Sequence, residues 1–375
     1  MKLALLHHQI IRGTGVETFL IEFARRLVAA GHEITCITTL TTPEIGASLP
    51  VRWELLPRVR ASATMRMWHF NRLAPRAAVQ AGVNLSIGFG RTCAQDIHRN
   101  GTGCHRLYGN LLPLWQRFSV RHLYELHLER RLYTGRTTRS LVTSSARVAA
   151  QLQGVYRSSG ERFHVLAPPV ETELFKPAEN RAATRDLLCR KLETDAAKPV
   201  LLFVSLSHRR RGLEPLLEAM RQVDATLWIA GKGLNARQYD FIQRHGLAAK
   251  VRVVPVTTSL VELYQSADWL VHPTQYDAFS MTVLQGMACG LPGIVSVMDG
   301  AVDHVRNDEN GLMLYHPAQP PELAARIQHA LALGQRAWQS ISEVARDTAL
   351  TLTWERHLQE WQALLDEPKE RLFDP

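Results

Sequence analysis

The second half of the chain alternates regularly between short apolar runs and segments with helical spacing, and this alternation is the strongest constraint on the fold. Between residues 198 and 298 the apolar runs are KPVLLFVSLS, ATLWIAG, KVRVVPV, DWLVHP and GIVSVM. Strands that alternate with helices of roughly ten to fifteen residues are typical of βαβ units. The pattern therefore predicts an α/β domain with a parallel sheet.

The first half begins with the same pattern. An apolar strand, LALLHH, is followed by a loop with Gly13 and Gly15, a helix over residues 17–30 and a second strand, EITCITTL. Strand, glycine turn, helix and strand make one βαβ unit of a doubly wound sheet. We predict further strands at 84–90 and 140–145, and mostly helical structure over the C-terminal stretch.

The chain of 375 residues, 46% of them hydrophobic, is long enough for two domains that each have their own core. Residues 153–178 are rich in proline and show no clear period, so we interpret them as the interdomain crossing and as a hinge. We predict a Rossmann-like first domain at 1–165 and a second at 166–355. Residues 356–375 would form a helix or tail that crosses back to the first domain.

Positive charge is concentrated in the first half. Residues 1–150 hold 20 Lys and Arg against 8 Asp and Glu, whereas the whole chain carries a formal charge of +9. A polyanionic partner is expected, and nucleic acid, an anionic membrane surface and a phosphorylated substrate all remain open. The segments 55–76 and 111–133 mix arginines with apolar and aromatic residues. Each predicts either an interfacial amphipathic segment on an anionic bilayer or a helix that packs on the core.

The sequence gives no indication of export or of a membrane span. No window approaches twenty unbroken apolar residues, and the first apolar run is too short for a signal peptide. The five cysteines are scattered and form no CxxC pair, as in a reduced cytosolic protein. We expect a cytoplasmic location, with peripheral contact on the inner face of the plasma membrane as an option.

Three arginines follow a predicted strand in VSLSHRRRG. Arg209, Arg210 and Arg211 lie at a strand-to-helix turn, where ligands of parallel sheets bind. Each guanidinium can bind a phosphate through two hydrogen bonds. The alternative interpretation is a solvated basic loop.

A second strand end leads into DAFSMTVLQ. Asp277 precedes a helix that begins near Ser280, and Gln285 follows about two turns later. Free N–H groups at that helix start would hold an anion, so Ala278, Phe279, Ser280 and Met281 are donor-binding candidates. The alternative is a core helix with an acidic residue at its start.

A third candidate is the loop Gly13–Thr14–Gly15, where the two glycines let a ligand approach the backbone closely. It lacks the third glycine of a dinucleotide-binding turn, so no such cofactor is expected.

The order of GTGVE, APPVETELFKP, RRRG and SADWLVHPTQYDAFSMTVLQGMACGLPGIVS resembles glycosyltransferase family 4 over nearly the whole chain. The segment GFGRTCAQDIHRNGTGCHRLY is similar to the lipopolysaccharide-core branch of that family. The resemblance implies the GT-B fold, in which two Rossmann-like domains face each other across a cleft. It implies a retaining transfer of a hexose from a nucleotide-diphosphate sugar, with UDP-sugars favoured, to a lipopolysaccharide-core or other glycan or glycolipid acceptor.

The resemblance also implies roles for individual residues. Gly15 and its neighbours would approach the donor diphosphate, and Arg210 and Arg211 would neutralise the leaving diphosphate. Asp277 and Gln285 stand where the family has two glutamates, which hold the donor sugar and the ribose. The remaining matches are Val256 and Thr257 for the base, His105 as a catalytic residue that faces the transferred sugar, and Arg99 and Asn100 on the acceptor side.

This sequence departs from the family at several of these positions. Asp277 is one methylene shorter than glutamate, Gln285 is uncharged, Arg211 replaces a lysine, and Pro168–Pro169 replace the usual asparagine–glycine. A catalytically impaired relative and a nucleotide-sugar epimerase of the same fold therefore remain alternatives. No DxD pair lies near the site, so we expect neither a metal nor another cofactor. We also expect no nucleic-acid partner, because that would leave the strand-end arginines unexplained.

Overall fold

The computed structural model describes residues 1–11, 13 and 15–367 and contains two compact units. Unit 1 comprises residues 1–167 and 360–375, and unit 2 comprises residues 168–359. Every named strand lies in one of two sheets, and the strands of both sheets pair in parallel within the described residues. The predicted α/β class with two Rossmann-like domains is confirmed.

The sheet of unit 1 has seven strands in the order β3-β2-β1-β4-β5-β6-β7, counted over the described part of the chain. The strands are β1 (Lys2–Leu6), β2 (Glu33–Thr38), β3 (Arg52–Leu55), β4 (Leu85–Phe89), β5 (Ile97–Asn100), β6 (Ser140–Thr143) and β7 (Phe163–Val165). The helices are α1 (Gly15–Ala29), α2 (Pro43–Ser48), α3 (Ala63–Gln80), α4 (His105–Tyr108), α5 (Leu114–Arg117), α6 (Val120–Thr134) and α7 (Ala146–Tyr156), with 3-10 turns at Gly109–Leu111 and Gly160–Arg162.

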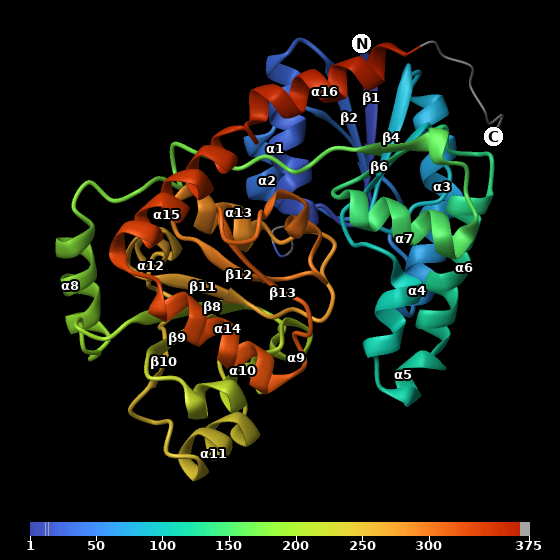
Figure 1. Cartoon of the computed structure of the whole chain (residues 1–375). Coiled ribbons are helices and arrows are strands. Elements are labelled where there is room, and N and C mark those ends of the chain that lie inside the picture. The colour runs from blue at the N-terminus through green and yellow to red at the C-terminus, as the bar shows by residue number, and fades with distance from the viewer. Residues whose placement is uncertain (12, 14, 368–375) are drawn as a thin grey trace. The chain divides into compact units, whose positions relative to one another are not determined.

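The sheet of unit 2 has six strands in the order β10-β9-β8-β11-β12-β13 among the described residues (Figure 1). The strands are β8 (Val200–Ser205), β9 (Thr226–Gly231), β10 (Val251–Val253), β11 (Trp269–His272), β12 (Gly293–Ser296) and β13 (Gly311–Leu314). The helices are α8 (Arg181–Lys191), α9 (His208–Arg211), α10 (Leu213–Ala219), α11 (Ala236–Arg244), α12 (Leu260–Ser266), α13 (Met281–Ala288), α14 (Pro320–Ala332) and α15 (Gln335–Leu350), with 3-10 turns at Met220–Gln222 and Gly300–His304.

Both sheets have the doubly wound strand order, which reverses beside the first strand of each unit. In unit 1 the reversal lies between β1 and β4, and in unit 2 it lies between β8 and β11. The connections that leave two such strands run to opposite sides of the sheet and leave a crevice at its carboxyl edge. The topology therefore marks one candidate binding position in each unit.

Apolar strands and helix faces form the core of unit 2. Leu201 and Phe203 on β8, Leu227 and Ile229 on β9, and Trp269 on β11 are fully buried. Alternate residues of these strands contact α10 and α14, which explains why the runs are almost entirely hydrophobic. Packing on these helices therefore positions the strands whose carboxyl ends carry the candidate site of unit 2.

The C-terminal helix α16 (Trp354–Asp366) belongs to both units. Its first part lies in unit 2, and its part from Glu360 onward lies in unit 1. Trp361 is fully buried against Phe23 of α1, with 4.8 Å between ring centroids. Unit 1 is therefore completed by the last helix that the structure describes.

The predicted crossing at 153–178 begins inside unit 1. Its first residues end α7, and residues 163–165 form β7, which pairs with β6. A three-residue strand is too short to show alternation in the sequence. The division between the units falls after Ala167, at Pro168.

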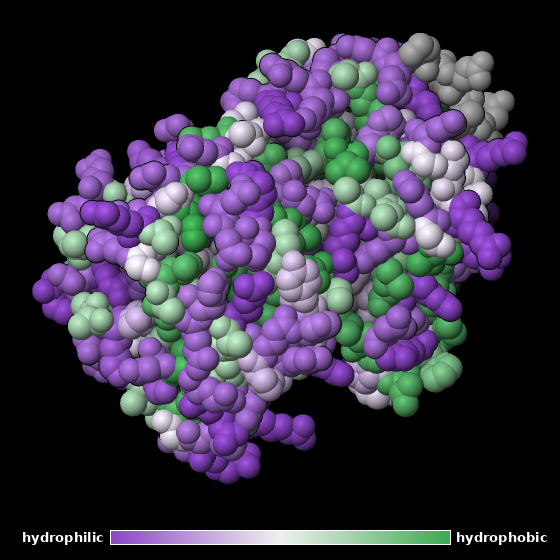
Figure 2. Space-filling view, in the orientation of Figure 1, coloured by the Kyte–Doolittle hydropathy of each residue, from purple (hydrophilic) through white to green (hydrophobic). Residues whose placement is uncertain are grey.

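No helix in the described ranges is long and apolar enough to cross a membrane. The predicted amphipathic segments form α3, α5 and α6 of unit 1. Figure 2 shows hydrophobic side chains gathered over α5. The exposed large apolar residues on these helices and their connections are Met65, Trp68, Val79, Leu114, Trp115, Phe118, Val120 and Leu123.

Candidate functional site

The turn after β8 carries the three arginines of unit 2 and lies beside the segment that follows β11. Gly212 ends α9 with φ 79°, a conformation that glycine adopts at low cost. A Cβ at this position would lie 2.2 Å from the carbonyl oxygen of Pro273, so the two segments touch through their backbones. The N–H of Gln275 donates to the carbonyl of Arg210 at 2.9 Å, which fixes the register of this contact.

Arg211 is the most engaged of the three arginines. Its Nη2 lies 2.7 Å from Oδ2 of Asp277, and its Nη1 donates to Oγ of Ser280 at 2.8 Å. The same Nη1 also contacts Nε2 of His272. Arg211 therefore reaches the start of α13, as the sequence-based site requires.

Arg210 has fewer protein partners than Arg211, and Arg209 has fewer still. Nη1 of Arg210 lies 3.3 Å from Oδ2 of Asp277 and donates to the carbonyl of Tyr276 at 3.4 Å, whereas its Nε and Nη2 form no hydrogen bond or ion pair with the described residues. The side chain of Arg209 is exposed and has no ion-pair partner among the residues that the structure describes. These two guanidinium groups retain donors that a bound anion could use.

His272 and Asp299 lie beneath the arginines and were not predicted from the sequence. Nε2 of His272 is 2.9 Å from Oδ2 of Asp299, and both side chains are fully buried. Burial, reinforced by Arg211, lowers the pKa of His272. Burial acts to raise the pKa of Asp299, but the hydrogen bond with His272 and the charge of Arg211 outweigh it, so that pKa is lowered. The pair thus supplies a carboxylate that supports Arg211.

The amino end of α13 presents free backbone donors. Oδ1 of Asp277 accepts from the N–H of Phe279 at 3.3 Å, and Oδ1 of Asp299 accepts from that of Ser280 at 3.0 Å. The next two N–H groups, those of Met281 and Thr282, have no acceptor among the described residues. A helix start with free N–H groups beside arginines is suited to an anion.

His272, Asp277 and Asp299 offer ligand atoms that all lie within 4.8 Å of one another, a spacing that could hold a metal ion. The guanidinium of Arg211, however, contacts both His272 and Asp277. An ion in this position would meet a fixed positive charge, so the donor set does not suit a metal in this arrangement. The absence of a metal requirement stays a prediction.

The remaining donor-binding candidates of unit 2 differ in exposure. Ala278 is buried, and the ring of Phe279 lies edge-on to His304 with centroids 5.8 Å apart. Val256 and Thr257 are exposed in the turn after β10. Oε1 of Gln285 accepts a hydrogen bond from the hydroxyl of Tyr264 at 3.2 Å, an interaction that the sequence did not predict.

The candidates of unit 1 gather at its own strand-order reversal, after β1 and the neighbouring strands. A Cβ on Gly13 or Gly15 would meet no atom within 4 Å, so neither glycine is required by the packing of the protein. Thr14 lies outside the described residues. Open space beside both glycines is compatible with a ligand close to the backbone.

Arg99, at the end of β5, is a buried cation. It is 7% exposed, and its guanidinium carbon lies 3.6 Å from the ring centroid of Phe19 on α1. Burial lowers its pKa to about 9, and no carboxylate among the described residues pairs with it. Neighbouring Asn100 is committed within the unit: its Oδ1 accepts from the N–H of Gly103 at 2.7 Å, and its Nδ2 donates to the hydroxyl of Tyr133 at 2.6 Å.

His105 is held by charged groups on two sides. Its Nδ1 lies 3.0 Å from Nη2 of Arg91, and its Nε2 lies 3.2 Å from Oε2 of Glu125 on α6. Its backbone N–H donates to Glu129. Burial and the charge of Arg91 lower the pKa of His105 to about 4, so its ring is neutral near pH 7.

Polar residues at the ends of predicted strands could have identified His272 and Asp299 from the sequence. His272 is the last residue of β11, and Asp299 follows β12 within three residues. Carboxyl ends of adjacent parallel strands meet at one edge, so such residues cluster. Glu125 and Glu129 gave no comparable signal, because acidic residues four apart on a helix are usually on a solvated face.

Comparison with known proteins gives two family matches that together span most of the chain. Glycosyl transferases group 1 matches residues 185–347, and Glycosyltransferase Family 4 matches residues 13–174. The chain belongs to glycosyltransferase family 4. The resemblance read from the sequence is thereby confirmed.

Curated relatives of this family 4 member align over different lengths. An uncharacterised glycosyltransferase of Methanocaldococcus jannaschii is 30% identical over 38% of each chain. The D-inositol 3-phosphate glycosyltransferase of Geodermatophilus obscurus is 30% identical over 58% of this chain, which spans half of that relative's length. Lipopolysaccharide glucosyltransferase WaaG of Escherichia coli K12 is 21% identical over 89% of this chain and 91% of its own.

Solved structures share the fold of this family 4 member over nearly its whole length. WaaG, a glycosyltransferase involved in lipopolysaccharide biosynthesis, superposes with a TM-score of 0.80 at 18% identity, covering 98% of this chain and 100% of WaaG. Anabaena Alr3699/HepE in complex with UDP and glucose superposes with a TM-score of 0.76 at 17% identity, covering 98% and 100%. The GT-B fold class is therefore confirmed.

Proposed function

We propose that this protein is a retaining glycosyltransferase that moves a hexose from a nucleotide-diphosphate sugar to a glycan acceptor. One observation carries the proposal: Arg210 and Arg211 converge on Asp277 at the amino end of α13. This arrangement lies at the strand-order reversal of unit 2, the position at which parallel sheets bind ligands. Family membership supports the same class of reaction.

The difficult step of such a transfer is departure of the diphosphate. Donors on Arg210, with the free N–H groups of Met281 and Thr282, would stabilise the negative charge that grows on the leaving group. Arg211 would act mainly by holding Asp277 and Ser280 in place, because its own terminal nitrogens already contact protein groups. Asp277 would then stay at the start of α13, where it could accept hydrogen bonds from the hydroxyls of the donor sugar.

A UDP-sugar is the favoured donor. The Anabaena HepE structures with UDP and UDP-glucose, which share the fold, support this choice. The exposed turn at Val256 and Thr257 would meet the base through its backbone.

The test of the donor is a thermal-shift screen of UDP-, GDP- and ADP-sugars, followed by donor hydrolysis. A ligand present at 100 times its Kd should stabilise the protein by about 2.7 kcal/mol. We expect a shift with UDP-sugars that is lost in the Arg210→Gln variant. A chain that responds to none of these donors would contradict the proposal.

The acceptor is proposed to be a lipopolysaccharide-core or other glycan. Neutral His105 and the unpaired guanidinium of Arg99 lie in unit 1, at the ends of β5 and the loop after it. These groups could bind hydroxyls and an anionic substituent of a sugar. The similarity to E. coli WaaG supports this choice of acceptor.

We further propose peripheral contact with an anionic membrane surface. Trp115 and Phe118 are 74% and 77% exposed, and arginines 117 and 121 lie beside them. Exposed aromatic residues beside cations suit the interface of a bilayer. In a vesicle-binding assay, the double variant Trp115→Ser with Phe118→Ser should bind anionic vesicles more weakly than the wild type. Equal binding by the double variant and the wild type would contradict this contact.

A catalytically impaired protein is the second candidate, because Gln285 replaces an acid and is already hydrogen-bonded to Tyr264. Asp277→Ala and Gln285→Glu separate the two candidates. An active enzyme should lose activity with Asp277→Ala, whereas an inert protein is indifferent to both changes. Conversion of a donor to its epimer without acceptor would instead identify an epimerase.

A further inference from the structure

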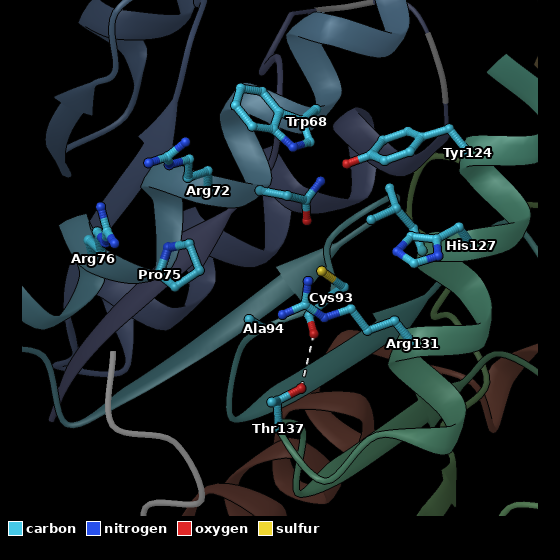
Figure 3. A pocket seen from close by; sticks show the side chains of 12 residues that line it. Trp68, Arg72, Pro75, Arg76, Cys93, Ala94, Tyr124, His127, Arg131 and Thr137 are labelled. Atoms are coloured by element: carbon cyan, nitrogen blue, oxygen red, sulfur yellow. Dashed lines mark hydrogen bonds between the residues drawn. The ribbon is translucent and has the colours of Figure 1, made fainter. Parts of the chain in front are cut away.

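A surface pocket of about 410 Å³ lies between α3 and α6 of unit 1 and is used by none of the roles proposed above (Figure 3). Its walls come from the two helices, and its floor comes from the loop after β4 and from Thr137. The lining residues are Trp68, Asn71, Arg72, Pro75, Arg76, Cys93, Ala94, Tyr124, His127, Leu128, Arg131 and Thr137.

The two helices contribute matching stripes of aromatic and basic side chains. Trp68, Arg72 and Arg76 recur every four residues on α3, so they share one face of that helix. Tyr124 and Arg131 lie on the facing side of α6, two turns apart. In Figure 3 the side chain of Arg131 extends from α6 toward Cys93 and Ala94, with Trp68 and Tyr124 on opposite helices.

Positive charge in this pocket is not compensated. Its lining contains no Asp or Glu, and no described residue forms an ion pair with Arg72, Arg76 or Arg131. Nearby Arg91 and Arg121, by contrast, both contact Glu125. Arg72, Arg76 and Arg131 are exposed, and three guanidinium groups around one hollow without an acid create a positive local potential that favours binding of an anion.

We propose that this pocket binds the phosphate group of an anionic lipid headgroup. Guanidinium groups bind phosphate through paired hydrogen bonds, and the indole of Trp68 supplies an amphipathic rim. The pocket volume is in the range that holds a small ligand. Exposed apolar residues such as Met65 and Leu123 lie on the same two helices, which suits a headgroup that is joined to acyl chains.

The test compares two variants with the same change of charge. The pocket variant is Arg76→Gln with Arg131→Gln, and its control is Arg130→Gln with Arg136→Gln. The control arginines are exposed and do not line the pocket. All four side chains are on the surface, so we expect both variants to fold. Unchanged thermal unfolding of both variants would verify this.

Binding is measured with two probes. The first is vesicles of phosphatidylcholine alone or with about one phosphatidylglycerol in four, which gives an anionic surface. The second is inorganic phosphate, followed by titration calorimetry. The vesicle probe tests a lipid headgroup, and the phosphate probe tests a free phosphate as the alternative source of the same chemistry.

A specific pocket predicts that the pocket variant loses at least about 10-fold more affinity for anionic vesicles than the control does. A delocalised attraction would weaken both variants equally, and that result would overturn the proposal. Saturable binding of inorganic phosphate that only the pocket variant loses, without a difference on vesicles, keeps the site but assigns it to a soluble phosphate. Binding of neither probe by the wild type would also overturn it. None of these outcomes depends on glycosyl transfer.

Discussion

At the scale of single residues, the three arginines of the β8–α9 turn differ in their contacts and exposure. Arg211 contacts Asp277, Ser280 and His272, whereas Arg209 is exposed. The repeated sequence RRR could not show this difference. The exposure of each arginine depends on the direction in which its side chain projects from the four-residue helix α9.

Replacement of Arg211 by lysine, the residue usual in the family, should impair this protein. One ammonium cannot keep both the 2.7 Å contact with Asp277 and the 2.8 Å hydrogen bond with Ser280 as a planar guanidinium does. We expect kcat/KM for the donor to fall roughly 100-fold, by about 2.7 kcal/mol. Arg336→Lys, at an exposed arginine of α15 outside the site, is the matched control and should change little. Equal activity of the two variants would remove the special role of Arg211.

Arg99→Met should separate stability from function. The guanidinium is buried and lacks a carboxylate partner among the described residues, so its removal deletes a desolvated charge. The free energy of unfolding, measured in urea, should stay the same or rise by about 1 kcal/mol. Transfer to a glycan acceptor should fall about tenfold or more. A clearly less stable variant would show instead that Arg99 acts through its contact with Phe19.

At the scale of elements, the site depends on how closely the turn after β8 approaches the segment after β11. Gly212→Ala would place a Cβ 2.2 Å from the carbonyl oxygen of Pro273 and would strain the positive φ. We expect a loss of at least about 1–3 kcal/mol in the free energy of unfolding.

The control for this prediction is Gly233→Ala, where a Cβ meets nothing within 4 Å. Urea unfolding of both variants should show a large effect only at Gly212. Donor hydrolysis by Gly212→Ala should fall as well, because the turn carries Arg210 and Arg211. An unperturbed Gly212→Ala variant would mean that the two segments can separate without cost.

Elements with strong apolar periodicity were predictable, and short or polar ones were not. β8 reads VLLFVS and α1 has a clear helical stripe, so both were predicted from the sequence. β5 reads IHRN, and all four of its residues are buried although three of them are polar. Its histidine, arginine and asparagine are accommodated by tertiary partners such as Gln95, Phe19 and Tyr133. No local rule would predict a strand from such residues.

At the scale of the whole molecule, the last helix should be essential for unit 1. Trp361 is fully buried beside Phe23, so Trp361→Ala should cost about 3–5 kcal/mol. Trp115→Ala is the control and should change the free energy of unfolding by less than about 0.5 kcal/mol, because Trp115 is exposed. Both values come from urea unfolding followed by circular dichroism. Equal stability of the two variants would show that unit 1 does not need α16.

Stability of the protein should fall in mild acid. Burial lowers the pKa of His8 and of His105 to about 4 and that of His98 to about 3, against an ordinary value of 6.5. Below pH 6.5 the unfolded chain takes up protons on these rings and the folded protein does not, so the free energy of unfolding declines until the folded pKa is reached. Each ring contributes a slope of at most about 1.4 kcal/mol per pH unit.

The measurement is thermal unfolding from pH 7 to pH 4.5. His98→Gln should show a shallower decline than the wild type, because one lowered pKa is removed. His316→Gln is the control, since His316 is exposed and should leave the slope unchanged. A wild-type stability that stays constant over this range would contradict the neutral burial of these histidines.

The sequence by itself determined the α/β class, the two Rossmann-like units and the strand-end positions of the basic turn and of Asp277. These follow from hydrophobic periodicity and from the rule that parallel strands expose their carboxyl ends together, both of which are local or topological. Only the tertiary structure decided that Arg211 contacts His272 and Ser280, that the hydroxyl of Tyr264 donates a hydrogen bond to Gln285, and that Trp361 packs on Phe23 in unit 1. Those contacts join residues 21 to 338 positions apart, and their energies depend on burial and distance, which no local pattern contains.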